Sequence, residues 1–279
     1  MRAIVHPGPV SAERHAAVTC TATPFAARLM PGRSVNQAVA EAFADAGFAS
    51  GYIRLRDALV DPMRYVMPAP SPDEIHAAWY SETYAPPGVT TIEDAGLIVG
   101  RRDGEPFLHC HGIWRTPDGE RRMGHLLPLE AQFAEPVEAE AWGLSGAGFD
   151  VTTDAETNFR LFKAMPASAE SASQGRRAIA CTIKPNGDIG TAVERICAEH
   201  GLADASIHGI GSLIGADFED APHFPSYATE VLVRHGEVRA GRATLDIALV
   251  GIDGSVAEGR LVRNTNPVCV TFELLLVAD

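Results

Sequence analysis

The sequence has 279 residues, of which 46% are hydrophobic and 21% are charged, as is usual for a soluble globular protein. No apolar run reaches the roughly 18–20 residues that a membrane-spanning helix needs, and the first residues lack the long apolar core of a secretory signal. The net charge of −13 argues against a protein that wraps nucleic acid or docks on anionic lipid, because either function needs a basic face.

The five cysteines are scattered along the chain without Cys-X-X-Cys spacing. We interpret them as small buried side chains in a reduced compartment, so a cytoplasmic protein without a disulfide framework is expected. Residues 1–20 are rich in Pro, His and Ala and show no clear period, which predicts an N-terminal arm, partly ordered against the body.

The first regular element is predicted to be a helix. Ser34 is suited to be its N-cap, Gln37 three residues later completes a capping box, and Gly47 ends it. Apolar residues recur between them at helical spacing, which predicts a core-facing stripe. A strand is expected to follow at Tyr52–Leu55.

Residues 67–90 are rich in Pro, Ser and Tyr and are too long for an ordinary connection. One interpretation is that this insertion covers a functional site, to which His76, Trp79 and Tyr80 would contribute. The other is a solvated loop that two aromatic side chains anchor to the body. The sequence leaves both open.

Histidines are concentrated in the stretch 107–125. His109 and His111 are two residues apart, so on a strand both imidazoles project from the same face. Pro117-Asp118-Gly119 is typical of a three-residue hairpin loop, with glycine in the left-handed position. The register of this loop places His125 opposite His111, with His109 on the diagonal at about 7–8 Å. A slip of one residue would turn His125 to the other face.

Three imidazoles on one face can supply three ligands to Zn²⁺ or another divalent transition metal and leave a fourth position open. A hydrogen-bonded polar cluster or a proton-transfer site without metal is the alternative. Catalysis would also need an acid or a base. The candidates near the motif are Glu105, Glu120, Glu130 and His76.

The second half of the chain repeats the first. A shift of 154 residues places Val35 on Ile189 and Gly47 on Gly201, so a second helix is predicted after Asn186-Gly187-Asp188. Further on, Asp118-Gly119 aligns with Asp253-Gly254. This order of helix, strand and Asp-Gly hairpin predicts a duplication.

Domain boundaries follow from the duplication and from composition. Residues 164–178 are small, polar and aperiodic, which is typical of a linker, and a strand is expected just before them at 158–162. The two similar domains are therefore predicted at residues 21–163 and 179–279.

The second copy keeps the hairpin but not the histidines. With the Asp-Gly turns superposed, the three histidines correspond to Thr244, Asp246 and Arg260. This asymmetry favours a chemical role for the first domain and a structural or completing role for the second. Gly209-Ile-Gly-Ser212 would let backbone approach a ligand closely, but it lacks the spacing of a dinucleotide fingerprint. Neither a Walker sequence nor a Gly-X-Ser-X-Gly elbow is present.

These motifs resemble the PPC domain family, a domain shared by plants and prokaryotes. The likeness covers roughly residues 25–145 and 178–278. The residues that carry it are Leu108-His-Cys-His111, Asp118-Gly119, Gly124-His-Leu126, Gly209-Ile-Gly-Ser-Leu213, Glu230-Val-Leu232, Asp253-Gly-Ser-Val-Ala-Glu-Gly259 and Asn266-Pro-Val268. The chain departs from the family pattern in three respects. The second copy lacks the histidines, the first copy lacks Gly-Ile-Gly, and the sequence contains no AT-hook.

The resemblance implies an α+β fold with two similar lobes, each an antiparallel-dominated sheet flanked by a few helices, and a homo-oligomer, commonly a trimer. That fold is similar to acetolactate decarboxylase, which binds zinc through a similar His-X-His…His arrangement. Carried over to this sequence, the likeness points to His109, His111 and His125 as ligands of Zn²⁺.

Three functions are compatible with these features. The first is a metal-dependent lyase or hydrolase, or a binding protein, for a small carbonyl- or carboxylate-type molecule; decarboxylation rests on analogy of fold alone. The second is a DNA-associated regulator, although Arg101-Arg102 and Arg121-Arg122 are more typical of solvated charges than of a phosphate track. The third is an oligomeric scaffold that binds partner proteins without catalysis.

Overall fold

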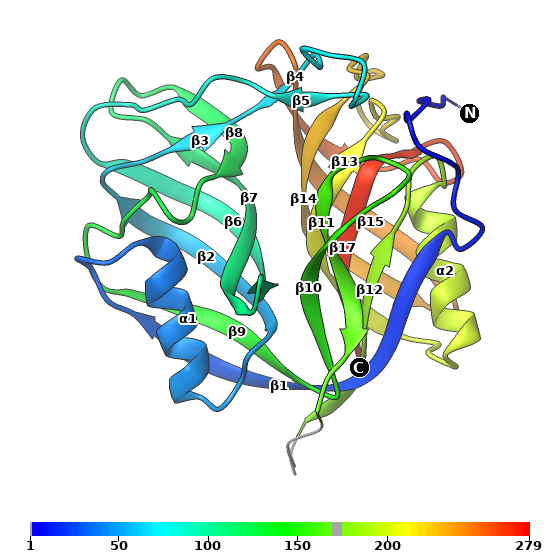
Figure 1. Ribbon diagram of the computed structural model, residues 1–279, viewed down its shortest axis with the longest axis horizontal. Coiled ribbons are helices and arrows are strands. Elements are labelled where there is room, and N and C mark those ends of the chain that lie inside the picture. Colours follow the sequence, from blue (N-terminus) through cyan, green and yellow to red (C-terminus); the bar gives the residue numbers. More distant parts are fainter. Residues whose placement is uncertain (1, 169–174) are drawn as a thin grey trace.

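The structure is a computed structural model that describes residues 2–168 and 175–279 (Figure 1). These residues form mostly antiparallel β-structure with two helices, α1 (Val35–Asp45) and α2 (Ile189–Glu199). The predicted mixture of sheets and a few helices is therefore correct in its coarse form, with strands clearly dominant. No helix within the described ranges is both long and apolar enough to cross a membrane.

Fifteen strands of the described chain belong to one sheet, whose main path runs β16-β15-β14-β13-β17-β12-β1-β9-β2-β6-β7-β8-β3. The hairpin β10–β11 leaves this path and joins the sheet at β6, and β4 and β5 form a separate pair. The strands are β1 (His15–Leu29), β2 (Gly51–Val60), β3 (Tyr65–Val66), β4 (Pro68–Ala69), β5 (Trp79–Tyr80), β6 (Thr90–Arg102), β7 (Glu105–Arg115), β8 (Arg121–Leu126), β9 (Val137–Ser145), β10 (Ala147–Thr153), β11 (Arg160–Pro166), β12 (Arg176–Ile183), β13 (Ala205–Leu213), β14 (Thr229–Arg239), β15 (Arg242–Gly251), β16 (Val256–Arg260) and β17 (Val268–Ala278).

The strand order shows the internal repeat. The sequence of neighbours β1-β9-β2-β6-β7-β8 is matched by β12-β17-β13-β14-β15-β16, and β1 pairs with β12 where the two series meet. The predicted shift of 154 residues also places the start of α1 on that of α2 and Gly51 of β2 on Ala205 of β13. The same supersecondary unit is therefore built twice, as the sequence repeat predicts.

Strand β1 connects the two units. Its first half pairs with β12 and its second half with β9, so one continuous strand, dark blue along the bottom of Figure 1, runs under both. The predicted arm 1–20 is therefore a strand from His15 onward. The predicted linker 164–178 is shorter than expected, because β11 continues to Pro166 and β12 begins at Arg176; its residues 169–174 lie outside the described residues. The strand expected at 158–162 corresponds to β11.

Both helices begin and end as the sequence predicts. The Ser34 side chain accepts a hydrogen bond from Gln37 N at 3.1 Å, and Asp188 accepts one from Thr191 N at 2.8 Å. Gly47 and Gly201 follow the two helices with φ of +82° and +62°, a conformation that favours glycine. All five cysteines are buried and unpaired, as predicted.

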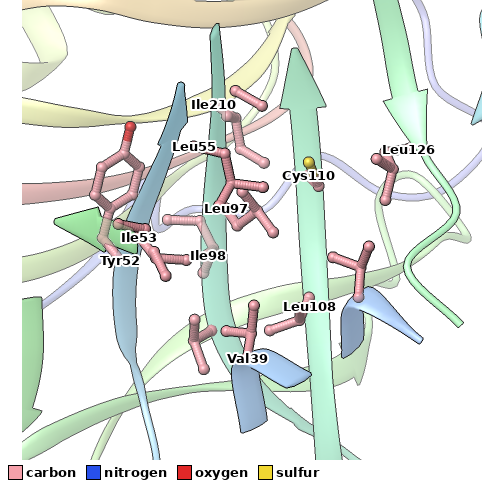
Figure 2. Close-up of a cluster of buried hydrophobic side chains, with 14 of the residues drawn as sticks. Val39, Tyr52, Ile53, Leu55, Leu97, Ile98, Leu108, Cys110, Leu126 and Ile210 are labelled. Carbon is pink, nitrogen blue, oxygen red and sulfur yellow. The ribbon is translucent and has the colours of Figure 1, made fainter. Parts of the chain in front are cut away.

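Hydrophobic packing joins the two units. Figure 2 shows part of the larger core, in which Val39 of α1 packs against sheet residues such as Leu97 and Leu108. The same core includes Leu232 of β14 and Ile210 of β13 from the second unit. Figure 2 shows Ile210 beside the strands of the first unit. A second core packs α2 against its own sheet. Because the larger core draws side chains from both units, their relative placement is fixed by packing as well as by β1.

A buried ion pair reinforces this contact. Arg54 of β2 donates to both carboxylate oxygens of Asp94, and each of these side chains is only 10% exposed. The same guanidinium donates to the backbone oxygens of Val233 at 2.7 Å and Arg234 at 3.3 Å, where β14 has a bulge. A side chain of the first unit therefore supplies hydrogen-bond donors to backbone carbonyl groups of the second unit, at a bulge where the strand pairing is irregular.

We expect Arg54→Met to lower the free energy of unfolding by about 3 kcal/mol. The variant removes the donor of two carbonyl groups and leaves the buried Asp94 carboxylate with only the longer contacts to Arg234 and Arg56, at 3.5 and 4.0 Å. Arg28→Met is the matched control. Its partner Glu138 and Arg28 itself are 69% and 68% exposed, so a change of less than about 1 kcal/mol is expected. Urea unfolding of both variants measures the difference, and equal losses would show that Arg54 has no special role.

Candidate metal centre

The β7–β8 hairpin adopts the predicted register. His111 and His125 are directly paired across the two strands. The loop is closed by hydrogen bonds from Thr116 N to the Glu120 oxygen at 3.0 Å and from Gly119 N to the Thr116 oxygen at 2.8 Å. Gly119 has a φ of +85°, the left-handed conformation that this turn requires. A local turn therefore determines which face His125 occupies.

The three histidines form a compact cluster. One ligand atom of each imidazole lies within 4.8 Å of the others, and His109 Nε2 is 3.0 Å from His111 Nε2. A tetrahedral zinc ion with Zn–N bonds of about 2.0–2.1 Å would separate its ligand nitrogens by about 3.3 Å. The spacing of these two nitrogens is therefore close to what such an ion needs.

The second unit holds the outer nitrogens of two of these rings. His109 Nδ1 lies 2.7 Å from Glu273 Oε2 on β17, and His111 Nδ1 donates to the Val231 backbone oxygen on β14 at 3.0 Å. Figure 1 shows β7 and β14 facing each other across the middle of the molecule. A carboxylate or a carbonyl group on the outer nitrogen is the usual arrangement for a histidine that binds metal through its other nitrogen.

A carboxylate of the second unit also reaches the inner side of the cluster. Glu230 Oε2 on β14 lies 2.7 Å from His111 Nε2. Two buried polar atoms next to it, His125 Nδ1 and Glu273 Oε1, have no hydrogen-bond partner among the described residues. Buried polar atoms are usually paired in a protein interior, so these two atoms are available to hydrogen-bond or coordinate a ligand at the cluster.

Burial and neighbouring charges shift the protonation of the cluster. Burial, together with the nearby His111, lowers the pKa of His109 to about 3, and burial next to the other two imidazoles also lowers the pKa of His125 strongly. Burial acts in the same direction on His111, but the Glu230 carboxylate outweighs it and raises the pKa of that imidazole. His109 and His125 therefore keep a free lone pair at neutral pH, whereas a metal ion would displace a proton from His111.

The two carboxyl groups differ from each other. Burial raises the pKa of Glu273 to about 8; His111 opposes this shift and Glu230 adds to it. Burial also disfavours the charged form of Glu230, but the contact with His111 prevails and lowers the pKa of Glu230. Glu230 is thus a carboxylate at neutral pH, whereas burial favours the protonated form of Glu273 in the metal-free protein. Metal binding by His109 Nε2 requires the ring proton on Nδ1, and Glu273 then accepts it as a carboxylate. In that tautomer the Nε2 lone pair of His109 faces His111.

Two hollows reach the cluster from different sides. The first, which encloses about 490 Å³ with its mouth, is lined by residues of the 67–90 insertion, by the histidine strand and by the second unit. Its lining includes Trp79, Tyr80, His109, His111 and Glu230. The second is a groove of about 1060 Å³ between the β8 end and the β10–β11 hairpin, and His109, His125 and Glu273 lie along it.

Part of the 67–90 insertion lies beside the histidine cluster, which agrees with the interpretation that this segment covers a site. Trp79 and Tyr80 form β5, and the Tyr80 ring lies 5.2 Å from the His125 ring. His76 is separate from the cluster: its ring packs against Trp79 at 4.4 Å and Phe159 at 4.7 Å, outside both hollows. His76 therefore supports the aromatic wall and is not placed to exchange protons with a ligand there.

Of the other three predicted acid–base candidates, only one lies in a hollow that reaches the histidines. Glu105 begins β7 and Glu120 lies at the hairpin loop, both exposed and outside the two hollows, whereas Glu130 lies on the groove. The carboxyl groups that touch the histidines are instead Glu230 and Glu273. The sequence carried one signal for Glu273, a lone acidic residue in the apolar strand Val268–Ala278. Contact between the two units could not be predicted from the sequence.

The second copy shows what replaces the histidines. Asp246 and Arg260 are paired on β15 and β16 in the register of His111 and His125, and their side chains form an exposed ion pair at 3.2 Å. The predicted correspondence is therefore confirmed.

Of the basic residues next to the first hairpin, Arg121 is ion-paired with Glu93 and Glu258.

Comparison with known proteins finds similar folds over about half of the chain. No protein-family model matches the sequence, and no curated protein matches it. Among solved structures, a metal-containing protein of Archaeoglobus fulgidus is similar over 51% of this chain and 94% of its own, with 20% identity and a TM-score of 0.41. A plant- and prokaryote-conserved (PPC) protein of Pyrococcus horikoshii is similar over 56% and 97%, with 15% identity and a TM-score of 0.42.

A third structure, a candidate DNA-binding protein of Ralstonia eutropha, is similar over 49% of this chain and 88% of its own, with 15% identity and a TM-score of 0.35. One of these solved structures is a PPC protein, the family that the sequence motifs resemble. Each match spans about half of this chain and most of the related protein.

The protonation pattern can be tested on the metal-free protein by NMR. We expect the His109 imidazole to stay neutral as the pH is lowered from 7 to 5, because burial disfavours its charged form and its pKa is about 3. His111, in contact with Glu230, should be the imidazolium of the cluster in the same spectra. Long-range ¹H–¹⁵N spectra distinguish the two forms. Protonation of His109 in this pH range would contradict the assignment.

Proposed function

We propose that His109, His111 and His125 bind a divalent transition-metal ion, most simply Zn²⁺, and that the protein binds or transforms a small carbonyl- or carboxylate-type molecule beside it. One observation carries the proposal: His109 Nε2 and His111 Nε2 converge at 3.0 Å while Glu273 and Val231 hold their outer nitrogens. Such support of the outer nitrogens orients imidazoles toward a metal.

The donor set suits this group of metals. Three imidazoles leave room for a further ligand, which is the composition of a catalytic rather than a purely structural zinc site. When bound, such an ion polarises a carbonyl oxygen or lowers the pKa of a bound water. Imidazole ligands are also accepted by other transition metals, so the choice among them depends on affinity and supply.

The chain itself supplies a group for proton transfer. Glu230 touches His111 and lines the first hollow, so its carboxylate is placed to take a proton from a molecule held there and to return it. Glu273 acts on the opposite side of the cluster by positioning His109. These roles are compatible with a lyase or a hydrolase, the two reaction types expected from the sequence.

The first test is the metal content of the purified protein, measured by elemental mass spectrometry without a His-tag or chelators. We expect close to one transition-metal ion per chain in the wild type and loss of most of it in His109→Ala and His125→Ala. His235→Ala, at an exposed histidine of β14, is the matched control and should keep the metal. A wild type that contains no metal and takes up no added Zn²⁺ would refute the proposal.

A second variant tests the support from the other unit. Glu273→Gln keeps the shape of the side chain but removes the carboxylate beside His109, so we expect metal affinity to fall about 10–100-fold. Competition with a chromophoric chelator measures this affinity. Glu237→Gln, at a partly exposed residue of β14 that is ion-paired with Arg239, serves as the control. Unchanged affinity in Glu273→Gln would mean that this carboxylate does not support the site.

A further inference from the structure

We infer that the ligand of the histidine cluster carries an anionic group, a carboxylate or a phosphate, which Arg102 binds in the groove between the β8 end and the β10–β11 hairpin. This inference rests on the proposed function and specifies the kind of molecule involved. It starts from Arg102 because this guanidinium makes no hydrogen bond or ion pair among residues 2–168 and 175–279. The acidic residues nearest to it in the chain and across the strands are Asp103 and Glu105, the latter being the cross-strand partner of Arg102.

The position of Arg102 is defined by its neighbours. Its guanidinium carbon lies 3.9 Å from the centroid of the Phe107 ring, and both residues line the groove. The cation–π contact holds the planar group against the wall while leaving its N–H donors unused. A free guanidinium in a concave site is well suited to bidentate binding of a carboxylate or a phosphate.

The pairing of β6 with β7 places Arg102 on the same face as the histidines. Gly100 pairs with Phe107 and Ile98 with His109, so alternate residues of the two strands share one surface. A side chain at Gly100 would collide with Phe149 and Phe162, and its absence lets the β10–β11 hairpin form the opposite wall. The groove is therefore closed on both sides between Arg102 and the cluster.

The groove has a polarity along its length. His125 and Glu273, each with a buried polar atom that has no partner among the described residues, line the part of the groove next to the cluster. Phe107 and His109 are two residues apart on β7, which corresponds to about 7 Å along a strand. A molecule with an anionic end on Arg102 and a reacting group at the cluster would thus need a spacer of only a few atoms, lying on the apolar walls.

The other charged residues of the groove lie at its rim or its base. Arg160 is paired with Asp103 at 2.6 Å, so its charge is already partly compensated. Glu130 is exposed. The first hollow, by contrast, contains no arginine or lysine in its lining. Of the two hollows that reach the histidines, only the groove has among its described lining residues a cationic side chain without an ion-pair partner, which is Arg102.

The test uses pairs of small hydroxamates on the metal-loaded protein, because a hydroxamate head binds metal whatever its tail. The probes are succinic monohydroxamate, its neutral amide analogue, and 3-phosphonopropionohydroxamate. Isothermal titration calorimetry gives the dissociation constants. We expect both anionic probes to bind at least about tenfold more tightly than the amide, the effect of one charge-assisted contact.

The variants isolate Arg102. Arg102→Met keeps the apolar stem over Phe107 and should abolish the preference for anionic tails, with the neutral probe unaffected. Arg101→Met is the matched control: Arg101 is exposed, lines a different hollow and should keep the preference. The thermal midpoint of each variant shows whether it remains folded.

The outcomes separate this inference from the metal proposal. If all three probes bind the wild type equally, the metal site stands and the role of Arg102 is overturned; the same follows if Arg101→Met and Arg102→Met lose the preference equally. If no probe binds protein whose metal content has been measured, this inference is overturned and the metal proposal stands; protein that takes up no metal refutes the metal proposal before any probe is added. A stronger effect of the phosphonate or of the carboxylate identifies which class of anion the groove prefers.

Discussion

The contact between the histidine face of β7 and the strands β14 and β17 of the other unit defines this molecule. Imidazoles at 109 and 111 project from the first unit, and a carboxyl group and a backbone carbonyl of the second unit hold their outer nitrogens at 2.7 and 3.0 Å. Without this contact the two imidazole rings would lack the hydrogen bonds that fix their orientation. The placement of the two units against each other is thus a condition for any chemistry at the cluster.

The duplication explains how one chain can build such a site. Both units have the same strand order, but one carries the histidines and the other carries Glu230 and Glu273. In the second copy the equivalent hairpin positions hold Asp246 and Arg260, an exposed ion pair. Because the hairpin forms in the same register with either pair, this register does not require imidazoles. The two copies were therefore free to specialise.

The interface combines apolar packing with buried charge. Its larger core includes Ile210 and Leu232 from the second unit, and Arg54 crosses to the backbone of β14 while it is paired with Asp94. Buried ionic groups contribute little net stability, but they penalise misaligned arrangements in which they would lack a partner. The same rule applies to the histidine–glutamate contacts, so packing and polar pairing specify one alignment together.

Local features were determined by the sequence alone. The caps at Ser34 and Asp188, the hairpin at Gly119 and the pairing of His111 with His125 all depend on residues close in the chain, and the structure agrees with each. The repeat was visible because both copies kept the same turns. The predicted acid–base residues Glu105, Glu120 and His76 were chosen by proximity in sequence, and none of them reaches the cluster.

Only the tertiary structure decided which groups complete the site. Glu230 and Glu273 are separated from His109 by more than one hundred residues, and a strand pattern records which face a side chain occupies but not which distant strand covers that face. The continuity of β1 across both units has the same origin, since a strand's two sets of neighbours are chosen by packing. Local backbone preferences thus fixed the elements, and long-range packing of the two copies fixed the site.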